Sequence, residues 1–365
     1  MRTGKPWVLI AAIGIVLCCA LWAGAGQAGS GRAELTPVAE MLKFDRLDPG
    51  LDRIIPAGAQ LERVATGYGW LEGPVWDKDT LFFADITGNS IRRLTPGTGV
   101  TTFLSPSGYK GSAPYGGPEP GTNGMTLDAR GRLTVAGHAG RTVFRFESQD
   151  GKGPMTILAD SYQGKKLNSP NDVVYRSDGS LYFTDPPYGL RTQGDNDPEK
   201  VLKVNGVYRI PNATAQKPGA EPARDKLQLL VTDLPRPNGI AFSPDEKYLY
   251  VNNSSPQKVW MRYTVKPDGT LADGKLLYDA TADKRPGAPD GMKVDGEGNI
   301  YSAGPGGVSI ISPEGKLLGT LLIPMRVSNV AWGGADRKTL YITGGGSIYR
   351  VRLSIAGEPL VRAHN

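Results

Sequence analysis

The chain has 365 residues, of which 39% are hydrophobic and 21% are charged, with 49 glycines and 29 prolines. This composition predicts a globular, β-rich protein with many turns, and the sequence shows little helical periodicity after its first segment. The formal net charge is +6, but the basic residues are scattered among acids, which argues against a nucleic-acid-binding surface.

The N-terminus has the pattern of a secretory signal peptide. Arg2 and Lys5 precede an apolar run over residues 7–22, and small residues follow it. A positive start, an apolar run and an Ala-x-Ala-like site are the three parts of such a peptide. We therefore expect residues 1–28 to be removed and the mature protein to be secreted, to the periplasm. An uncleaved membrane anchor is the alternative interpretation.

The sequence offers few ligands for a soft metal. Its only cysteines, Cys18 and Cys19, lie in the apolar run, and the residues before them do not favour lipidation. The mature chain would therefore have no disulfide, no thiol nucleophile and no Cys-ligated metal. The only histidines, His138 and His364, cannot by themselves build a His-rich zinc site. A Gly-x-Ser-x-Gly elbow, a phosphate-binding Gly-rich loop and a dinucleotide fingerprint are also missing from the sequence.

Two segments near the ends of the main domain are predicted to share a sheet. Residues 29–59 form a leader rich in Gly, Ala, Pro and mixed charge, which either wraps the outside of the domain or stays loose. Residues 60–66 alternate like an edge strand, and residues 347–353 do the same. In a ring of blades the first and last segments commonly lie in one sheet, so we predict that these two pair. Residues 354–365 are expected to form a tail.

One sequence pattern recurs six times between these segments. In its clearest copy, residues 169–189, a polar pair opens a short apolar run, and a Ser-Asp-Gly turn leads to a second run. β-Branched and aromatic residues bounded by Gly, Asp and Pro are typical of hairpins. The copies are spaced by about 39 to 67 residues, a range that indicates stacked blades or an array. Each copy opens on a carboxylate or a carboxamide: Glu72, Asn123, Asn171, Asn238, Asp290 and Asn329.

Further strand-like segments between the hairpins bring the total to about four strands per repeat. Six four-stranded sheets around a channel predict an all-β fold, a six-bladed β-propeller over residues 60–353. Two longer loops, residues 105–121 and the insertion over residues 190–229, are either functional rims or solvated excursions.

The openings of four copies form a candidate metal site. If each lies at the same end of an innermost strand, then Glu72, Asn171, Asn238 and Asp290 converge on the central channel. Two carboxylates and two carboxamides offer only oxygen donors, which suit a hard divalent cation. Ca²⁺ is the favoured ion, and Zn²⁺, Mn²⁺ and Mg²⁺ are the alternatives. The competing interpretation is that Asn-Gly and Asp-Gly are ordinary tight-turn dipeptides, but their shared position across the repeats favours the metal site.

Other polar residues near the predicted strand ends are candidates for the wall of a substrate pocket. They are Asn123, His138, Asp172, Asp185 and Tyr188. The competing interpretation for each of them is a structural role, capping a strand end or a turn.

Several motifs resemble the SMP-30/gluconolactonase/luciferin-regenerating-enzyme family. They are LEGPVW at residues 71–76, SPNDV with FTDPPYG in the third copy, RPNGIAFSPDE at 236–246, PDGMKVD at 289–295 and SNVAWGG at 328–334. Together, in this order, the motifs are specific, and the resemblance covers residues 60–353. The sequence is most similar to the bacterial gluconolactonases of this family.

The resemblance implies a six-bladed propeller that holds a divalent cation in its channel, with lactone hydrolysis as the best-known activity. It implies the same four ligands as the residue chemistry and assigns the acid/base role to Asp290. One position departs from the family pattern: Ser169 stands where animal members have an Arg that binds sugar hydroxyls. Sugar recognition must therefore come from elsewhere in this chain.

These observations predict a metal-dependent lactonase of gluconolactonase type, a carboxylic ester hydrolase that opens a sugar lactone such as glucono-1,5-lactone. In this hypothesis the cation polarises the carbonyl and Asp290 activates water. The expected partner is a small lactone or ester, with no nucleic acid, and with no membrane unless the N-terminal segment stays attached.

Two other functions are compatible with the same sequence features. One is a hydrolase of phosphotriesterase or fluorophosphatase type that uses the same site. The other is a non-catalytic periplasmic binding propeller, which the two carboxylates and two carboxamides argue against, because a scaffold has no need of converging charged ligands.

Overall fold

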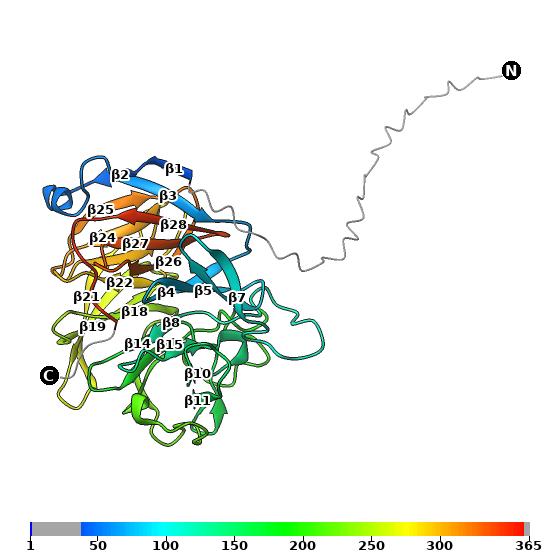
Figure 1. Cartoon of the computed structure of the whole chain (residues 1–365). Coiled ribbons are helices and arrows are strands. Elements are labelled where there is room, and N and C mark those ends of the chain that lie inside the picture. The colour runs from blue at the N-terminus through cyan, green and yellow to red at the C-terminus, as the bar shows by residue number, and fades with distance from the viewer. Residues whose placement is uncertain (2–37, 361–365) are drawn as a thin grey trace. The chain divides into compact units, whose positions relative to one another are not determined.

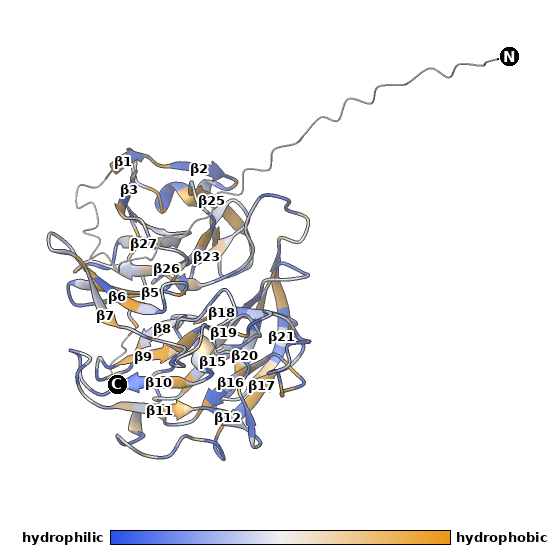
Figure 2. Cartoon of the chain, turned by 90° about the vertical axis from the view of Figure 1, so that its right-hand side faces the viewer, coloured by the Kyte–Doolittle hydropathy of each residue, from blue (hydrophilic) through white to orange (hydrophobic). Residues whose placement is uncertain are grey.

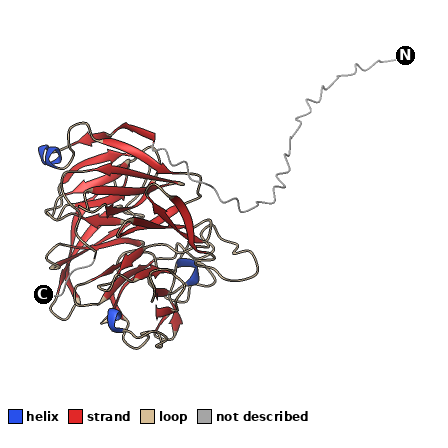
Figure 3. Ribbon diagram, viewed as in Figure 1, coloured by secondary structure: helices blue, strands red, loops and turns tan. Residues whose placement is uncertain are grey.

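The computed structural model describes Met1 and residues 38–360. The predicted signal peptide, the first part of the leader and the end of the tail lie outside the described residues. Nearly all of the regular structure is strand (Figure 3), and the helices of the described part are three short 3-10 helices: η1 (Pro49–Arg53), η2 (His138–Gly140) and η3 (Ala213–Ala215). No helix within residues 38–360 is both long enough and apolar enough to span a bilayer.

Residues 38–360 form six antiparallel sheets that are the blades of a β-propeller (Figure 1), which confirms the predicted fold. Blades one and two contain β4 (Leu71–Asp77), β5 (Thr80–Asp85), β6 (Ser90–Thr95) and β7 (Gly99–Leu104), then β8 (Met125–Leu127), β9 (Leu133–Ala136), β10 (Val143–Phe146) and β11 (Met155–Ala159). Blades three and four contain β14 (Val173–Tyr175), β15 (Leu181–Asp185), β16 (Gly206–Ile210) and β17 (Gln228–Val231), then β18 (Pro237–Phe242), β19 (Tyr248–Asn253), β20 (Val259–Val265) and β21 (Leu271–Asp279). A separate two-stranded ribbon contains β12 (Ser161–Tyr162) and β13 (Lys165–Lys166).

Blades five and six each gain a fifth strand from the leader. They contain β22 (Met292–Val294), β23 (Ile300–Gly304), β24 (Gly307–Ile311), β25 (Leu317–Leu322) and β2 (Lys43–Arg46), then β26 (Val327–Gly333), β27 (Thr339–Gly344), β28 (Ser347–Arg352), β3 (Gln60–Ala65) and β1 (Val38–Met41). Residues 38–46 therefore wrap the outer edges of two neighbouring blades.

The ring closes within blade six. Strand β3 pairs with β28, with Arg63 opposite Tyr349 and Leu61 opposite Val351, so the predicted pairing of the two segments is present. The innermost strands β4, β8, β14, β18, β22 and β26 contact one another in that order, and β26 contacts β4 again. The six innermost strands therefore surround one channel.

The apolar core is divided among the spaces between neighbouring blades. Within residues 38–360 the buried apolar side chains form six clusters, and each cluster joins two adjacent blades. In β15, for example, Phe183 packs toward blade two while Tyr182 packs toward blade four. Because both faces of a blade are buried, its strands are continuous apolar runs instead of alternating ones. The hydrophobic colouring lies mainly on the strands, for example on β9 (Figure 2).

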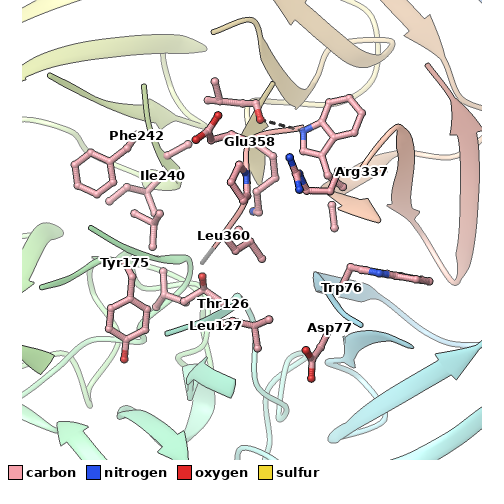
Figure 4. Close-up of a pocket in the computed structure, with 18 of the residues that line it drawn as sticks. Trp76, Asp77, Thr126, Leu127, Tyr175, Ile240, Phe242, Arg337, Glu358 and Leu360 are labelled. Atoms are coloured by element: carbon pink, nitrogen blue, oxygen red, sulfur yellow. Dashed lines mark hydrogen bonds between the residues drawn. The ribbon is translucent and has the colours of Figure 1, made fainter. Parts of the chain in front are cut away.

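The C-terminal segment covers the end of the channel where the innermost strands finish. A cavity of about 230 Å³ lies there, lined by residues of all six innermost strands and by residues 358–360. Leu360 lies in the middle of the labelled side chains (Figure 4). The Glu358 N–H donates to the Val294 carbonyl at 3.0 Å. A Cβ at Gly357 would lie 1.8 Å from Cγ of Trp332, so only glycine allows the chain to lie against this indole.

Candidate active site

A second cavity, of about 320 Å³, lies at the opposite end of the channel, where the innermost strands begin. Its wall contains all four predicted metal ligands together with other side chains: Trp70, Glu72, Thr87, Pro118, Glu119, Asn123, Asn171, Tyr188, Asn238, Ser254, Asp290 and Arg326. Residues separated by more than 200 positions in the sequence are thus brought to one cavity by the ring.

Hydrogen bonds between blades fix the backbone of the site residues. In each case a donor on one blade binds the carbonyl of the site residue on the next blade. The bonds run from Gly124 N to Asn171 O at 2.7 Å, from Thr184 Oγ1 to Asn238 O at 2.8 Å, and from Asn252 Nδ2 to Asp290 O at 2.5 Å. The neighbouring blade therefore sets the backbone position of Asn171, Asn238 and Asp290.

The glycines that follow the site residues allow this close approach. A Cβ at Gly239 would lie 2.2 Å from the Asp290 carbonyl oxygen, and one at Gly291 would lie 1.8 Å from Cγ of Asn329. Neither glycine has a positive φ, and Gly239 lies inside β18. These dipeptides are not turns, so the competing interpretation of Asn238-Gly239 and Asp290-Gly291 is wrong.

Two asparagines of the cavity wall, Asn123 and the proposed ligand Asn238, have buried side-chain carbonyl oxygens. Asn238 donates its Nδ2 to Ser254 Oγ at 3.0 Å, and Ser254 donates onward to the Pro289 carbonyl at 2.7 Å. Oδ1 of Asn238 is buried and has no hydrogen-bond partner among the described residues, and the same is true of Oδ1 of Asn123. A buried carbonyl oxygen without a partner is costly, and a bound cation would satisfy it.

The two carboxylates of the site are buried close to other negative charge. Burial raises the pKa of Glu72 to about 7, and the charges of Asp172 and Glu119 add to the rise. Burial also raises the pKa of Asp290 well above its ordinary value, and the charge of Glu72 contributes. Glu72 Oε2 accepts hydrogen bonds from Gly73 N at 2.9 Å and from Asn329 Nδ2 at 3.1 Å, so the sixth repeat supports the first.

These residues fit a hard divalent cation. Such an ion would allow both buried acids to ionise and would bind the unpartnered amide oxygen of Asn238. Within residues 38–360 no group of three or more His, Cys, Asp or Glu side chains is arranged to hold a metal. The candidate set differs from such a group because carboxamides supply half of its oxygens.

The sequence of the propeller matches a known family. The sequence model of the protein family described as SMP-30/gluconolactonase/LRE-like region matches residues 70–346, which is more than half of the chain. The chain belongs to this family. The predicted membership is therefore confirmed.

Individual members of the SMP-30/gluconolactonase family are similar over most of the chain. The gluconolactonase of Zymomonas mobilis is 34% identical over 349 residues, which are 92% of each chain. The 6-deoxy-6-sulfogluconolactonase of Pseudomonas putida is 28% identical over 312 residues, 79% of this chain and 94% of that protein. The structure of a gluconolactonase from Xanthomonas campestris superposes with a TM-score of 0.71 at 30% identity, covering 87% of this chain and 97% of that one.

In the present chain, two of the five predicted substrate-binding residues line the candidate active-site cavity, and three do not. Asn123 and Tyr188 lie on its wall. Asp172 and Asp185 are buried away from the wall, with 1% and 0% exposure. His138 is fully buried and reaches the cavity only through Glu119, because its Nε2 lies 2.7 Å from Glu119 Oε2.

Asp185 supports the loop that carries Asn171. Its carboxylate accepts hydrogen bonds from the backbone N–H groups of Asn168 at 2.8 Å and Ser169 at 2.7 Å. Burial raises the pKa of Asp185 to about 7. Its location indicates a structural role beneath the third blade's site residue.

Asp185 is expected to make stability depend on pH. Because its folded pKa of about 7 lies above the unfolded value of about 3.9, the stability it contributes is full below about pH 4. That contribution is lost as the pH rises through about 7. Urea unfolding of the wild type and Asp185→Asn should show a wild-type advantage that is larger, by a few kcal/mol, near pH 5 than near pH 8.

Asp283 provides the matched control for this measurement. Hydrogen bonding to Arg285 lowers the pKa of Asp283, so Asp283→Asn should change stability equally at both pH values. The interpretation of Asp185 fails if its variant shows the same difference from the wild type near pH 5 and near pH 8.

Glu119, Arg326 and Trp70 line the cavity but were not predicted from the sequence. Glu119 belongs to the irregular loop of residues 105–121, where no strand register indicates which side chains point inward. The Arg326 guanidinium lies 5.3 Å from the centre of the Trp70 ring, and its positive charge partly offsets the rise in the pKa of Asp290. The presence of an acid in the long loop was the one signal that could have identified Glu119.

Proposed function

We propose that this chain is a cation-dependent lactonase that hydrolyses a sugar lactone such as glucono-1,5-lactone. One observation carries the proposal: two carboxylates and two carboxamides from four blades line a single cavity, and Oδ1 of Asn238 has no partner there. The lactonase names of the similar proteins support the same reaction class. We also propose that the enzyme acts in the periplasm, which the signal-peptide pattern of residues 1–28 supports.

The proposed ligands are Glu72, Asn171, Asn238 and Asp290, with Ca²⁺ as the favoured ion. A bound divalent cation would supply Lewis-acid polarisation of the lactone carbonyl, worth several kcal/mol in the transition state. The chain's own part is to hold these oxygens rigidly, through the bonds between blades and the support of Glu72 by Asn329.

Asp290 is the proposed general base. Its Oδ1 accepts a hydrogen bond from Gly291 N at 3.1 Å, which leaves Oδ2 to take a proton from the attacking water. Water then adds to the carbonyl carbon and the bond from that carbon to the ring oxygen breaks. Asp290 returns the proton to the ring oxygen, which becomes a hydroxyl group of the open acid. General-base catalysis of this kind contributes typically about 10²- to 10⁴-fold.

A panel of substrates tests the reaction class. The wild-type protein with Ca²⁺ should open glucono-1,5-lactone, followed by proton release in a weakly buffered pH-indicator assay. Hydrolysis of a phosphotriester such as paraoxon, followed by release of its phenolate, should be slower by at least about 100-fold in kcat/KM. Faster turnover of the phosphotriester would reassign the site, and binding of lactone without turnover would indicate a binding propeller.

A further inference from the structure

The loop of residues 105–121 places one acid on the wall of the cavity. Glu119 lines it with its side chain 21% exposed, and one carboxylate oxygen lies 2.7 Å from Nε2 of the fully buried His138. Both residues lie outside the four proposed cation ligands.

Hydrogen bonds at its base hold this loop in place. Gly121 N donates to the Ile86 carbonyl at 2.9 Å, and Tyr109 N donates to the Pro120 carbonyl at 2.7 Å. The side chain of Asn89 donates to the Tyr109 carbonyl at 2.7 Å. Glu119 is therefore presented by a fixed segment, as a recognition residue requires.

His138 is itself fixed by the third blade. A Cβ at Gly189 would lie 2.7 Å from Cγ of His138 and 2.8 Å from Cβ of Ser169, so the three residues are packed together. Ser169 donates its hydroxyl to the Pro186 carbonyl at 2.5 Å and accepts from Gly189 N at 2.9 Å. The Ser169 hydroxyl is therefore occupied by hydrogen bonds within the protein, and because the residue is fully buried it does not reach the cavity.

We propose that Glu119, positioned by His138, accepts hydrogen bonds from the ring hydroxyls of the substrate and so selects hydroxylated lactones. The inference rests on the proposed function and names the group that recognises the sugar. His138 binds Oε2, Oε1 has no hydrogen bond within residues 38–360, and the side chain lines a cavity of about 320 Å³, a size suited to a small ring. A carboxylate only accepts hydrogen bonds, and sugar hydroxyls are donors. A site built around such a pair strongly rejects an analogue without the hydroxyl groups.

Two lactones with the same six-membered ring allow recognition of the hydroxyl groups to be measured separately from the ring-opening step. Glucono-1,5-lactone carries hydroxyl groups and δ-valerolactone carries none. Glu119→Gln should lower kcat/KM for glucono-1,5-lactone about 10- to 100-fold, mainly through KM, because a charge-assisted hydrogen bond is lost. The same variant should change kcat/KM for δ-valerolactone by less than about threefold.

Variants of His138 test its positioning role. His138→Leu removes the partner of Glu119 and should show the same selective rise in KM, while His138→Gln keeps a donor and should recover part of the loss. Glu199→Gln is the matched charge control, since Glu199 is an acid on a neighbouring loop that pairs with Arg191 at 3.4 Å outside the cavity. It should leave both lactones unaffected.

The test compares the ratio of kcat/KM for glucono-1,5-lactone to kcat/KM for δ-valerolactone in the wild type and in Glu119→Gln. If Glu119→Gln changes this ratio by less than about threefold, the inference is overturned, whether both activities fall or neither does. If the wild type opens neither lactone, the proposed function fails, and calorimetry with 1,5-anhydro-D-glucitol, which has the hydroxyls but no carbonyl, decides the inference separately. Binding that Glu119→Gln weakens about tenfold or more supports hydroxyl recognition, and equal or undetectable binding overturns it.

Discussion

Asp290→Asn is expected to lower kcat for lactone opening by about 10²- to 10⁴-fold while the cation stays bound. Asparagine keeps a carbonyl oxygen at the ligand position but removes the proton acceptor. Its amide still fits beside Gly291, because the two side chains have almost the same shape. Steady-state kinetics with glucono-1,5-lactone and calorimetric titration with Ca²⁺ measure the two properties separately.

Asp273→Asn is the control for this substitution. Asp273 is exposed on the outer strand of blade four, so the same chemical change should leave kcat and Ca²⁺ affinity unchanged. Unchanged turnover in Asp290→Asn would remove the base from the mechanism. A variant that lost both the cation and turnover would show that Asp290 acts first as a ligand.

Chelation of divalent cations is expected to abolish lactone opening. Without a cation, two acids with raised pKa values and the unpartnered oxygen of Asn238 would remain in the cavity. A cation that binds only the folded ring stabilises it by about 2.7 kcal/mol at 100 times its Kd, so chelation should also lower Tm. Assays and thermal unfolding with and without EDTA measure both effects.

Adding back single ions identifies the one that the site prefers. Ca²⁺, Mn²⁺, Zn²⁺ and Mg²⁺ are returned separately to the chelated protein, and Ca²⁺ is expected to restore the most activity because all donors are oxygens. Glu72→Gln should weaken the response to Ca²⁺ without unfolding the protein. Full activity after thorough chelation would contradict the proposed role of the cation.

The repeat pattern was sufficient to predict the propeller because every blade buries both of its faces. Apolar runs such as residues 81–84, bounded by turns, follow directly from this packing and are local in sequence. The leader strands β1 and β2 could not be read in the same way. They are four residues each and mostly exposed, so they carry no apolar pattern. Their pairing with the outer edges of two blades depends on tertiary contacts, which the local sequence does not reveal.

The convergence of the four candidate ligands on one cavity was predictable because each stands at the opening of its repeat. The side chains beside them were harder to place. Asp172 neighbours Asn171 but is buried off the cavity wall, and Asp185 turns toward the backbone of its own blade. Glu119 lies in an irregular loop whose course depends on contacts with Ile86 and Asn89, distant in sequence. Local patterns carry no information about such contacts.

The covering of one channel end by residues 358–360 is expected to determine how a substrate reaches the candidate active site. The cavity beside the C-terminal segment and the candidate active-site cavity share no lining residue, so within residues 38–360 they are two separate cavities. We therefore expect lactone and opened acid to enter and leave at the other end of the channel, beside Glu119 and Arg326. An acid that has not yet departed occupies the space of the next lactone, so the enzyme should be slowed by its own product in a competitive manner.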